Sequence, residues 1–359
     1  MPRTPKPDQV AALLAAGNVW LAPMAGVTDQ LFRAICHEHG CPLAVTEMVS
    51  ATGLAYGSAK TRQLYAPGPG EERVAVQLFG SDPDELARAA TAVEADLGEK
   101  LALIDLNMGC PVPKVTRKGA GSALMRDPER AAAIVRAVDS AVSVPVSAKF
   151  RRGISLEDEN CVDFARALEE AGASLLAVHG RTAGQLYRGR ADWGCIAQVK
   201  QAVSVPVLGN GDLTDAVTAT SQMARSGVDG ALVGRGALGN PWIFAQIAEV
   251  QAGREPRIPG IAERVAQLRE HCHRFAAWRE ESQASEKGPG RPRGRRRQPA
   301  NHHEQLGPNL SAMRKHAMWY LSGLPGASRL RAQVNGCTSL EDFDALCDRA
   351  LELAGEAGL

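Results

Sequence analysis

The chain has 359 residues, which is long enough for one large domain and a smaller one. Its 41 lysines and arginines nearly balance 40 acidic residues, so the protein as a whole does not bind nucleic acid through bulk positive charge. Eight cysteines without a Cys-x-x-Cys pair, no apolar run of membrane-spanning length and no signal-peptide core at the start predict a cytoplasmic protein with reduced thiols and no membrane contact.

Short apolar runs recur along the first two thirds of the chain, and helical-looking segments lie between most of them. Buried parallel strands are expected to have continuous apolar runs rather than alternating ones. Several helical segments begin at a favourable N-cap residue, for example Asp29, Ser81, Asp127 and Ser155. The predicted strands cover 19–25, 43–49, 74–79, 101–107, 144–150, 174–179, 205–210 and 230–234, and the predicted helices cover 29–39, 83–97, 127–142, 156–171, 192–203 and 215–226.

Eight strand-then-helix units in this order predict an α/β fold, namely a (β/α)8 TIM barrel. We place this barrel at 19–254, after an N-terminal lead-in at 1–18. The connection between the second and third strands, at 50–73, has the weakest helical pattern of the series.

The strand pattern ends near Pro256, and the later segments 261–279, 310–321 and 340–354 have helical patterns. They predict a small C-terminal helical domain at 255–359. A segment rich in Arg, Pro and Gly interrupts it at about 283–304, and we expect it to be disordered because this composition cannot bury a core. Its most biased part, 285–300, holds six basic residues and one acid. Such a run is either a solvated linker or a salt-sensitive contact to RNA, and both interpretations stay open.

Chemistry in a TIM barrel gathers where the strands end at their carboxyl side. Cys110 follows the fourth predicted strand at a Gly-Cys-Pro corner, beside a basic, glycine-rich loop at 114–122. A lone cysteine usually packs as a small hydrophobe, but here the neighbours favour a thiol presented at the mouth of the barrel beside cations. Nearly every other predicted strand also ends in a polar or charged group, including Glu47, Gln77, Asn107, Lys149, His179, Asn210 and Arg235.

Two glycine turns follow the seventh and eighth predicted strands, at 209–212 and 234–239. Backbone N–H groups in such turns bind phosphate at helix N-termini, so we expect a phosphate site there. The second turn also matches the dinucleotide pattern Gly-x-Gly-x-x-Gly, but it follows the last strand of a series, so we expect no Rossmann domain. Lys149 would place a cation against the ring of a reduced flavin, and Gln77 would meet its polar edge. For His179, the nearby Arg181 favours ligand binding over proton transfer.

Two further clusters contain residue types that bind metals, at 36–41 and 271–273. Neither has the paired spacing of a structural zinc site, because neighbouring residues on a helix face different ways. We therefore predict no metal.

Taken together, these motifs resemble the tRNA-dihydrouridine synthases, and specifically their bacterial B-type branch. The resemblance covers roughly 19–251 and 305–350. Its motifs are Leu-Ala-Pro-Met-Ala-Gly-Val-Thr-Asp (21–29), Asn-Met-Gly-Cys-Pro (107–111), Lys-Gly-Ala-Gly-Ser-Ala-Leu (118–124), Val-His-Gly-Arg-Thr (178–182), Gly-Asn-Gly-Asp (209–212), Gly-Arg-Gly-Ala-Leu-Gly-Asn-Pro-Trp (234–242), Met-Arg-Lys-His-Ala-Met-Trp-Tyr-Leu (313–321) and Gly-Leu-Pro-Gly-Ala (323–327).

This resemblance implies a barrel that binds FMN, a helical domain that binds tRNA, and NADPH as the reductant. It also implies that Cys110 is the proton donor. The residues it implies around the flavin are Pro23, Met24, Ala25, Gln77, Lys149, His179, Asn210, Gly211, Asp212, Gly234 and Arg235, and the residues we expect at the tRNA are Asn107, Arg151, Arg181, Arg314, Lys315 and His316. The chain departs from the family pattern in the arginine-rich insert and in Phe150 and Arg152, and neither departure alters the implied chemistry.

Reduction of the C5=C6 bond of uridine needs a hydride at C6 and a proton at C5. The resemblance implies that reduced FMN supplies the hydride and that Cys110, as a protonated thiol, supplies the proton as general acid. Since the ordinary pKa of a thiol is about 8.5, this role needs no large shift. The uridine must also leave the interior of the tRNA, which costs unstacking energy. We expect a monomeric enzyme that acts on D-loop uridines.

Two alternatives belong to other functional classes. The first is a flavin-dependent reductase of a small molecule on the same barrel, which would have no need of the basic and aromatic residues at 314–319. The second is a non-catalytic RNA-binding protein, which would have no need of Cys110, Lys149 and both glycine turns.

Overall fold

The computed structural model describes residues 4–286 and 309–358. The chain forms two compact units, one made of Met1–Ala237 and Pro241–Arg257, the other of Leu238–Asn240 and Ile258–Leu359. The predicted disordered insert lies mostly outside the described residues. Among the helices in the described ranges, none is both long and apolar enough to cross a membrane.

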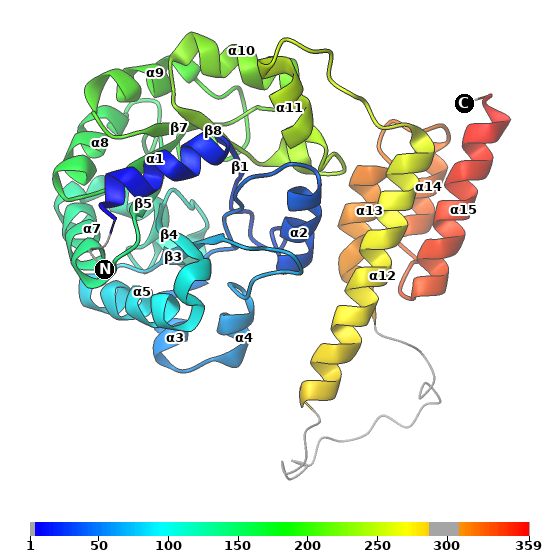
Figure 1. The fold of residues 1–359 in the computed structure, drawn as a ribbon, viewed down its shortest axis with the longest axis horizontal. Helices are drawn as coiled ribbons and strands as arrows, with labels where there is room; N and C mark the ends of the chain where they lie inside the picture. Colours follow the sequence, from blue (N-terminus) through cyan, green and yellow to red (C-terminus); the bar gives the residue numbers. More distant parts are fainter. Residues whose placement is uncertain (1–3, 287–308, 359) are drawn as a thin grey trace. The chain divides into compact units, whose positions relative to one another are not determined.

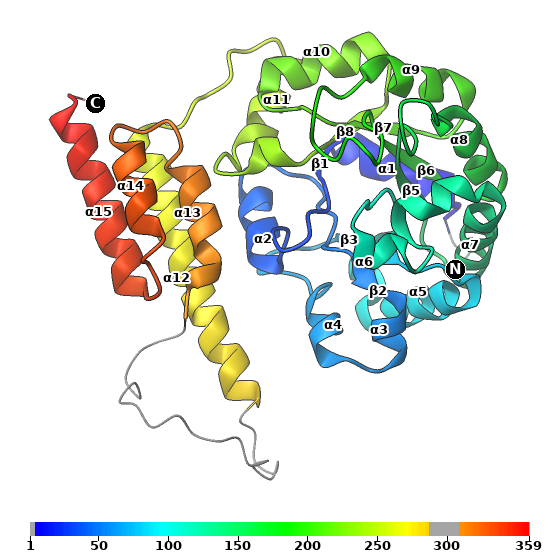
Figure 2. The ribbon, with the colours of Figure 1, turned by 180° about the vertical axis from the view of Figure 1, so that it is seen from behind.

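The strands of the first unit form a single parallel sheet in the order β1-β8-β7-β6-β5-β4-β3-β2. The ring closes through the parallel bridge between Leu21 and Ala44, and Val45 continues it to Ala75 of β3. This confirms the predicted (β/α)8 barrel, whose helices surround the strands in Figures 1 and 2. The strands are β1 (Val19–Leu21), β2 (Val49–Ser50), β3 (Val74–Phe79), β4 (Leu101–Met108), β5 (Val146–Arg151), β6 (Leu175–His179), β7 (Val207–Asn210) and β8 (Gly230–Val233).

Aspartate side chains start many of the barrel helices, because a carboxylate at the N-cap accepts hydrogen bonds from the first free N–H groups. Asp29, Asp82, Asp127, Asp192 and Asp215 all do so. The helices of the first unit are α1 (Lys6–Ala16), α2 (Gln30–Glu38), α3 (Ala51–Ala55), α4 (Ala59–Gln63), α5 (Pro83–Leu97), α6 (Pro113–Thr116), α7 (Pro128–Ala141), α8 (Cys161–Glu170), α9 (Trp193–Ala202), α10 (Ala216–Ser226) and α11 (Ile243–Gln251). The predictions of Ser81 and Ser155 as N-caps were wrong, because the N-cap of α5 is Asp82 and that of α8 is Asn160.

Several barrel elements differ from the predicted ones, and the first strand ends at Leu21 rather than at residue 25. The predicted strand at 43–49 pairs with its neighbours only by isolated bridges before the two residues of β2. The predicted helix at 156–171 begins only at Cys161, because Ile154 and Gly153 instead turn back to pair with Asp158 and Glu159. The weakly helical connection at 50–73 contains two short helices, α3 and α4.

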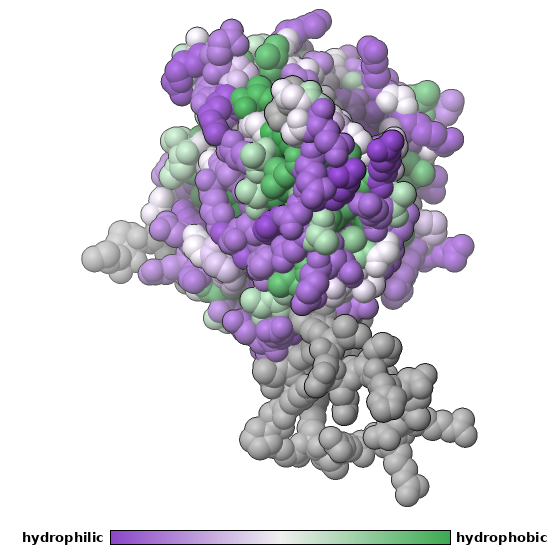
Figure 3. Space-filling view, turned by 90° about the vertical axis from the view of Figure 1, so that its right-hand side faces the viewer, coloured by the Kyte–Doolittle hydropathy of each residue, from purple (hydrophilic) through white to green (hydrophobic). Residues whose placement is uncertain are grey.

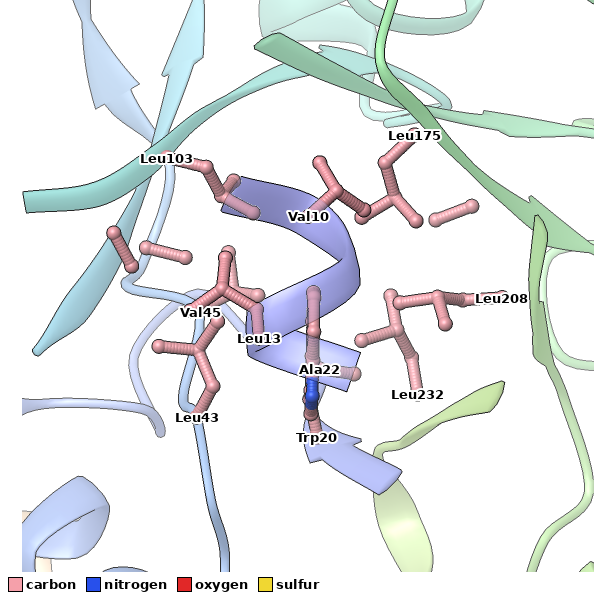
Figure 4. Packing of buried hydrophobic residues seen from close by; sticks show 13 residues of the cluster. Val10, Leu13, Trp20, Ala22, Leu43, Val45, Leu103, Leu175, Leu208 and Leu232 are labelled. Atoms are coloured by element: carbon pink, nitrogen blue, oxygen red, sulfur yellow. The ribbon is translucent and has the colours of Figure 1, made fainter. Parts of the chain in front are cut away.

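Helix α1 closes the N-terminal end of the barrel. Its Val10 and Leu13 are buried against residues from the amino-terminal halves of several strands, as Figure 4 shows. The strand residues of this cluster include Trp20, Leu103, Leu175, Leu208 and Leu232. The expected lead-in at 1–18 is thus mostly a helix that plugs one end of the barrel, which leaves the opposite end for a ligand.

Side chains of alternate strand residues point into the barrel. Leu103 of β4 belongs to the interior cluster, so Asp105 and Asn107, two and four residues later, point to the same side. The same alternation puts Lys149 of β5 in the interior, since the sheet register places it beside Asn107 and Ala177. The interior thus changes from apolar at the end closed by α1 to polar where the strands end.

The second unit is helical in its described residues, with α12 (Ile261–Glu286), α13 (Arg314–Tyr320), α14 (Ala327–Val334) and α15 (Leu340–Glu356). Helix α14 was not among the predicted elements. Ser339 and Asp342 form a capping box that starts α15. The face of the molecule in Figure 3, turned from the right-hand side of Figure 1, is mostly hydrophilic with small apolar areas between.

Candidate active site

The polar residues predicted at the strand ends converge in the interior of the barrel. The sheet register places Asn107 beside Lys149, Arg151 beside His179, and His179 beside Asn210. These residues come from four neighbouring strands, β4 to β7, so one end of the barrel collects amide, ammonium, guanidinium and imidazole groups. The prediction that they lie together follows from strand geometry alone, and the register bears it out.

Cys110 lies just after β4 and differs from the other cysteines. All eight are free thiols, seven are buried, and Cys110 is the one with intermediate exposure. Its backbone N–H donates to Asn107 Oδ1 (2.9 Å), and its carbonyl accepts from the Ser122 N–H (3.0 Å). Gly121 packs so close that a Cβ there would lie 2.5 Å from the Cys110 carbonyl oxygen. The peptide of this accessible thiol is therefore held on both sides.

Asn107 and Gln77 connect Cys110 to the barrel interior. Asn107 Nδ2 donates to Gln77 Oε1 (2.7 Å), and Gln77 Nε2 donates to Asp105 Oδ2 (2.7 Å). Gln77 and Asp105 are both buried. Arg151, on the other side, donates from Nε to the Gly109 carbonyl (2.8 Å) and so fixes the residue before the thiol.

Lys149 and Asn210 form a pair across β5 and β7. Lys149 Nζ donates to Asn210 Oδ1 (3.1 Å), while Asn210 Nδ2 donates to the Leu232 carbonyl (2.7 Å). Burial, followed by the charge of Arg151, lowers the pKa of Lys149 to about 8, although Asp105 and Cys110 work against this shift. A lysine with that pKa is still mainly a cation at neutral pH.

His179 is buried within a group of cations. Burial lowers its pKa far below the usual value, and the charges of Lys149, Arg151, Arg181 and Arg235 lower it further. Its ring faces Gly211, where an added Cβ would lie 3.2 Å from His179 Nε2. A histidine that stays neutral at pH 7 does not act as a proton donor there, so these surroundings favour a binding role.

Asp212 forms ion pairs with two of these cations, Arg181 and Arg235. Its carboxylate accepts from Arg181 Nη2 (2.8 Å), from Arg235 Nη2 (3.0 Å) and from the Ala191 N–H (2.8 Å). Burial alone would raise the pKa of Asp212, but these hydrogen bonds and the two guanidinium charges outweigh it and lower the pKa. The carboxylate is thus engaged by the protein itself, and its predicted contact to the cofactor stays a prediction.

Two observations indicate that this group of cations fits an anionic ligand. Arg181 is 2% exposed, yet its Nη1 has no hydrogen-bond partner among the described residues, and an orphaned buried donor is costly. At Gly234 an added Cβ would meet nothing closer than Met24 Sδ at 3.6 Å, so the chain itself does not require a glycine there. Space at a glycine turn and an unpaired guanidinium nitrogen are both features that suit a phosphate group.

The loop after β1 supplies the remaining predicted cofactor residues, Pro23, Met24 and Ala25. The Met24 N–H donates to Thr28 Oγ1 (3.0 Å), and the Met24 carbonyl accepts from the N–H groups of Val27 and Thr28. Met24 also lies nearest to Gly234 of the eighth strand end. Because β1 pairs with β8, this loop and the last glycine turn are neighbours.

The loop after β6 contains residues that the sequence analysis missed. Leu186 has a φ of 53°, unusual for a residue with a side chain, and its carbonyl accepts from Arg151 Nη1 (3.0 Å). Tyr187 is exposed, and the Arg235 guanidinium carbon lies 5.0 Å from the centre of its ring. No local sequence signal marks these two residues, since their contacts are with the distant Arg151 and Arg235.

The three predicted tRNA contacts of the C-terminal region all lie on α13 in the second unit. Arg314 Nε donates to the Cys337 carbonyl (2.7 Å), and Arg314 and Lys315 are both partly exposed. His316 is instead 1% exposed, with its ring 4.5 Å from that of His271. In this structure His316 therefore packs inside its unit, whereas its two neighbours are partly open to solvent.

The two clusters with metal-binding residue types have other contacts. His37 Nδ1 lies 2.6 Å from the Cys41 carbonyl, and its Nε2 lies 3.2 Å from Glu71 Oε1. Within the described ranges, no three His, Cys, Asp or Glu side chains are arranged as a set that could hold a metal ion.

The chain is similar to known proteins over almost all of its length. The family model described as "Dihydrouridine synthase (Dus)" matches residues 20–287. The "Probable tRNA-dihydrouridine synthase 1" of Synechocystis sp. is 37% identical over 352 residues, which are 97% of this chain and 90% of that protein. The "tRNA-dihydrouridine synthase B" proteins of Pseudomonas aeruginosa and Pseudomonas putida are each 40% identical, over 91% and 92% of this chain and 90% and 89% of their own lengths. The chain belongs to the dihydrouridine synthase family.

Proposed function

We propose that this protein reduces the C5=C6 bond of D-loop uridines in tRNA, with FMN as its flavin and NADPH as the reductant. Membership of the family makes it an enzyme that reduces uridine in tRNA, and enzymes of this family are flavin-dependent oxidoreductases. The identity of the flavin, the reductant and the role of each residue are the proposal. A monomeric, cytoplasmic enzyme is part of it.

The residues that would hold FMN lie at one end of the barrel. Arg181, with its unpaired Nη1, and Arg235 beside the Gly234 turn supply positive charge for the phosphate. Lys149 supplies a cation, and Gln77 an amide, for the ring. When bound, reduced FMN supplies the hydride for C6 of the uridine.

Cys110 would give the proton to C5. The observation that carries this role is its exposure: it is the one thiol of eight that is partly open, and it lies beside the cations of the barrel mouth. Asn107 fixes its backbone, and Arg151 fixes the residue before it. The same two side chains would orient the uracil, and Arg314 and Lys315 on α13 would contact the tRNA outside the barrel.

A Cys110→Ala variant tests this role. We expect it to bind flavin and tRNA like the wild type and to accept electrons from NADPH, because only the proton donor is lost. Dihydrouridine formation should fall by a factor of about 100 to 10,000, which is the usual contribution of a general acid. The matched control is Cys161→Ala, which removes a buried thiol of the same barrel. Normal dihydrouridine formation by Cys110→Ala would refute the assigned role.

A further inference from the structure

Asp105 is a buried carboxylate whose role the proposed reaction leaves open. It lies in the middle of β4, it is 4% exposed, and it follows an apolar run. The sheet register places it directly between Gln77 of β3 and Ser147 of β5. A charged group in a barrel interior is costly unless every oxygen is satisfied. Such a residue therefore calls for a specific explanation.

Both carboxylate oxygens of Asp105 accept hydrogen bonds from these neighbours. Ser147 Oγ donates to Oδ1 (2.6 Å), and Gln77 Nε2 donates to Oδ2 (2.7 Å). Burial raises the pKa of Asp105, while both hydrogen bonds and the nearby Lys149 cation oppose this rise. Asp105 thus faces the hydroxyl of β5, the amide of β3 and the ammonium group of Lys149.

The bonds continue in one direction from Asp105 to the thiol residue. Gln77 turns its nitrogen to Asp105 and its oxygen to Asn107 Nδ2 (2.7 Å). Asn107 then turns its own oxygen to the N–H groups of Cys110 (2.9 Å) and Gly109 (3.3 Å).

The two ends of this chain allow the amides in the middle only one orientation. An ionised carboxylate accepts and never donates, whereas a backbone N–H donates and never accepts. Gln77 and Asn107 could each be turned by 180° if they were isolated, since an amide can donate from one side and accept from the other. Between Asp105 and Cys110, either turn would bring two donors or two acceptors together.

We propose that Asp105 is a positioning residue for the reduction of uridine. It fixes the orientation of the Gln77 and Asn107 amides, and through them the peptide that carries the Cys110 thiol. This inference rests on the proposed function, because it takes Cys110 as the proton donor. The hydrogen bonds from Asp105 reach the thiol residue only through Gln77 and Asn107, so its effect should be largest in the step that needs the thiol.

A double-mutant cycle with Ser147 tests this role. In Asp105→Asn, the new amide can still offer its oxygen to Gln77, provided that Ser147 accepts from its nitrogen. In Ser147→Ala, the carboxylate remains and the orientation is kept. In Asp105→Asn/Ser147→Ala, the Asp105 end no longer favours one orientation of the amides, and only the N–H groups of Cys110 and Gly109 at the other end still do. The effects of the two changes should therefore not add.

The measurement is the rate at which NADPH-reduced enzyme forms dihydrouridine in a single turnover with saturating tRNA. We expect this rate to fall about threefold in each single variant, as for the loss of one hydrogen bond. In the double variant it should fall about 100-fold, as for a misplaced catalytic group. Because Gln77 is also a proposed flavin contact, the rate of flavin reduction by NADPH is measured in the same variants. In the double variant, dihydrouridine formation should fall further than flavin reduction, since only dihydrouridine formation needs the thiol. A role in stability alone would change both half-reactions in parallel.

The outcomes separate this inference from the proposed function. A wild type that forms no dihydrouridine, or a Cys110→Ala variant that forms it normally, would overturn the proposed function and this inference with it. With both of those controls as expected, additive losses across the cycle would overturn the role of Asp105 alone. Should the double variant fail to fold, Asp105→Leu takes its place, and a single-turnover rate within about twofold of Ser147→Ala would refute the inference.

Discussion

Arg33 and Glu71 show how a single buried ion pair fixes the α2 side of the barrel. Both side chains are 0% exposed, and Arg33 Nη2 lies 2.9 Å from Glu71 Oε2. The guanidinium also donates to the carbonyls of Thr28 and Ala66, so the pair connects the start of α2 to the loop before β3. Burial alone would raise the pKa of Glu71, but hydrogen bonds from His37 and Arg33 and the Arg33 charge outweigh it and lower the pKa to about 2.

We predict that Glu71→Gln destabilises the protein by about 3 kcal/mol at pH 7, since it leaves Arg33 as a buried charge without its partner. Because the pKa of Glu71 is lower in the folded than in the unfolded state, its contribution is complete above a pH of about 4.5 and is lost as the pH falls toward 2. Urea unfolding at pH 7 and pH 3.5 measures this contribution. The difference in free energy of unfolding between Glu71→Gln and the wild type should be smaller at pH 3.5.

The matched control for this variant is Asp163→Asn, which breaks an exposed ion pair with Arg166. Pairs of that kind contribute little, so its free energy of unfolding should stay within about 0.5 kcal/mol of the wild type. Equal effects of the two substitutions at pH 7 would contradict the role given to the buried pair.

At the candidate active site, the residues that could be predicted from the sequence are those that lie at the carboxyl ends of strands. Lys149, His179 and Asn210 lie where parallel strands stop, and any eight-stranded barrel brings such positions together. Asp105 was missed, although a carboxylate within an apolar run was a readable signal. Tyr187 was missed because contacts from distant arginines, rather than local pattern, determine its loop.

Helix α1 is the element whose role the sequence did not reveal. Its Val10 and Leu13 fill the end of the barrel opposite to the candidate active site (Figure 4). The strands themselves were predicted well wherever both faces are covered, as in β3 and β4, because burial on both faces requires a continuous apolar run. The segment 43–49 was predicted as one strand, but it pairs with the neighbouring strands only through single bridges. Continuous pairing depends on the geometry of those neighbouring strands, which the sequence of the segment itself does not reveal.

We predict that Leu13→Ala destabilises the barrel by about 3 kcal/mol, because it leaves a cavity under the strands. Flavin content and the rate of NADPH oxidation at 20 °C should not change, since this helix lies at the other end of the barrel from the site. Leu14 is only partly buried against the same cluster, so Leu14→Ala should lower the free energy of unfolding by less than Leu13→Ala does. Loss of flavin from a Leu13→Ala protein that is still folded would contradict the separation of the two ends.

At the scale of the whole molecule, the chain divides into a barrel that holds the candidate chemistry and a helical unit that holds the predicted tRNA contacts. From residue 255 on there are 16 basic and 13 acidic residues, and segment 285–300 contains six of the bases and one of the acids. Without that segment the region has ten basic and twelve acidic residues, a net charge of −2. The proposed binding of tRNA by the helical unit therefore depends on the placement of individual cations rather than on bulk charge.

We predict that deletion of 285–300 leaves a folded, active enzyme that binds tRNA more weakly and with less dependence on salt. If its arginines contact phosphates, the slope of log K against log salt should fall by about 2 to 4, from the release of fewer counterions. Filter binding of tRNA between 50 and 300 mM KCl measures this slope. An unchanged slope would mean that the segment is a linker.

The most direct test of the central claim is to map dihydrouridine in unmodified tRNA after incubation with the purified protein, FMN and NADPH. Reaction products are located by mass spectrometry of nuclease fragments, with Cys110→Ala as the control. We expect dihydrouridine at defined D-loop positions with the wild type, and at least about 100-fold less with the variant. A protein whose bound flavin is reduced by NADPH but which leaves every tRNA uridine unchanged would contradict the account.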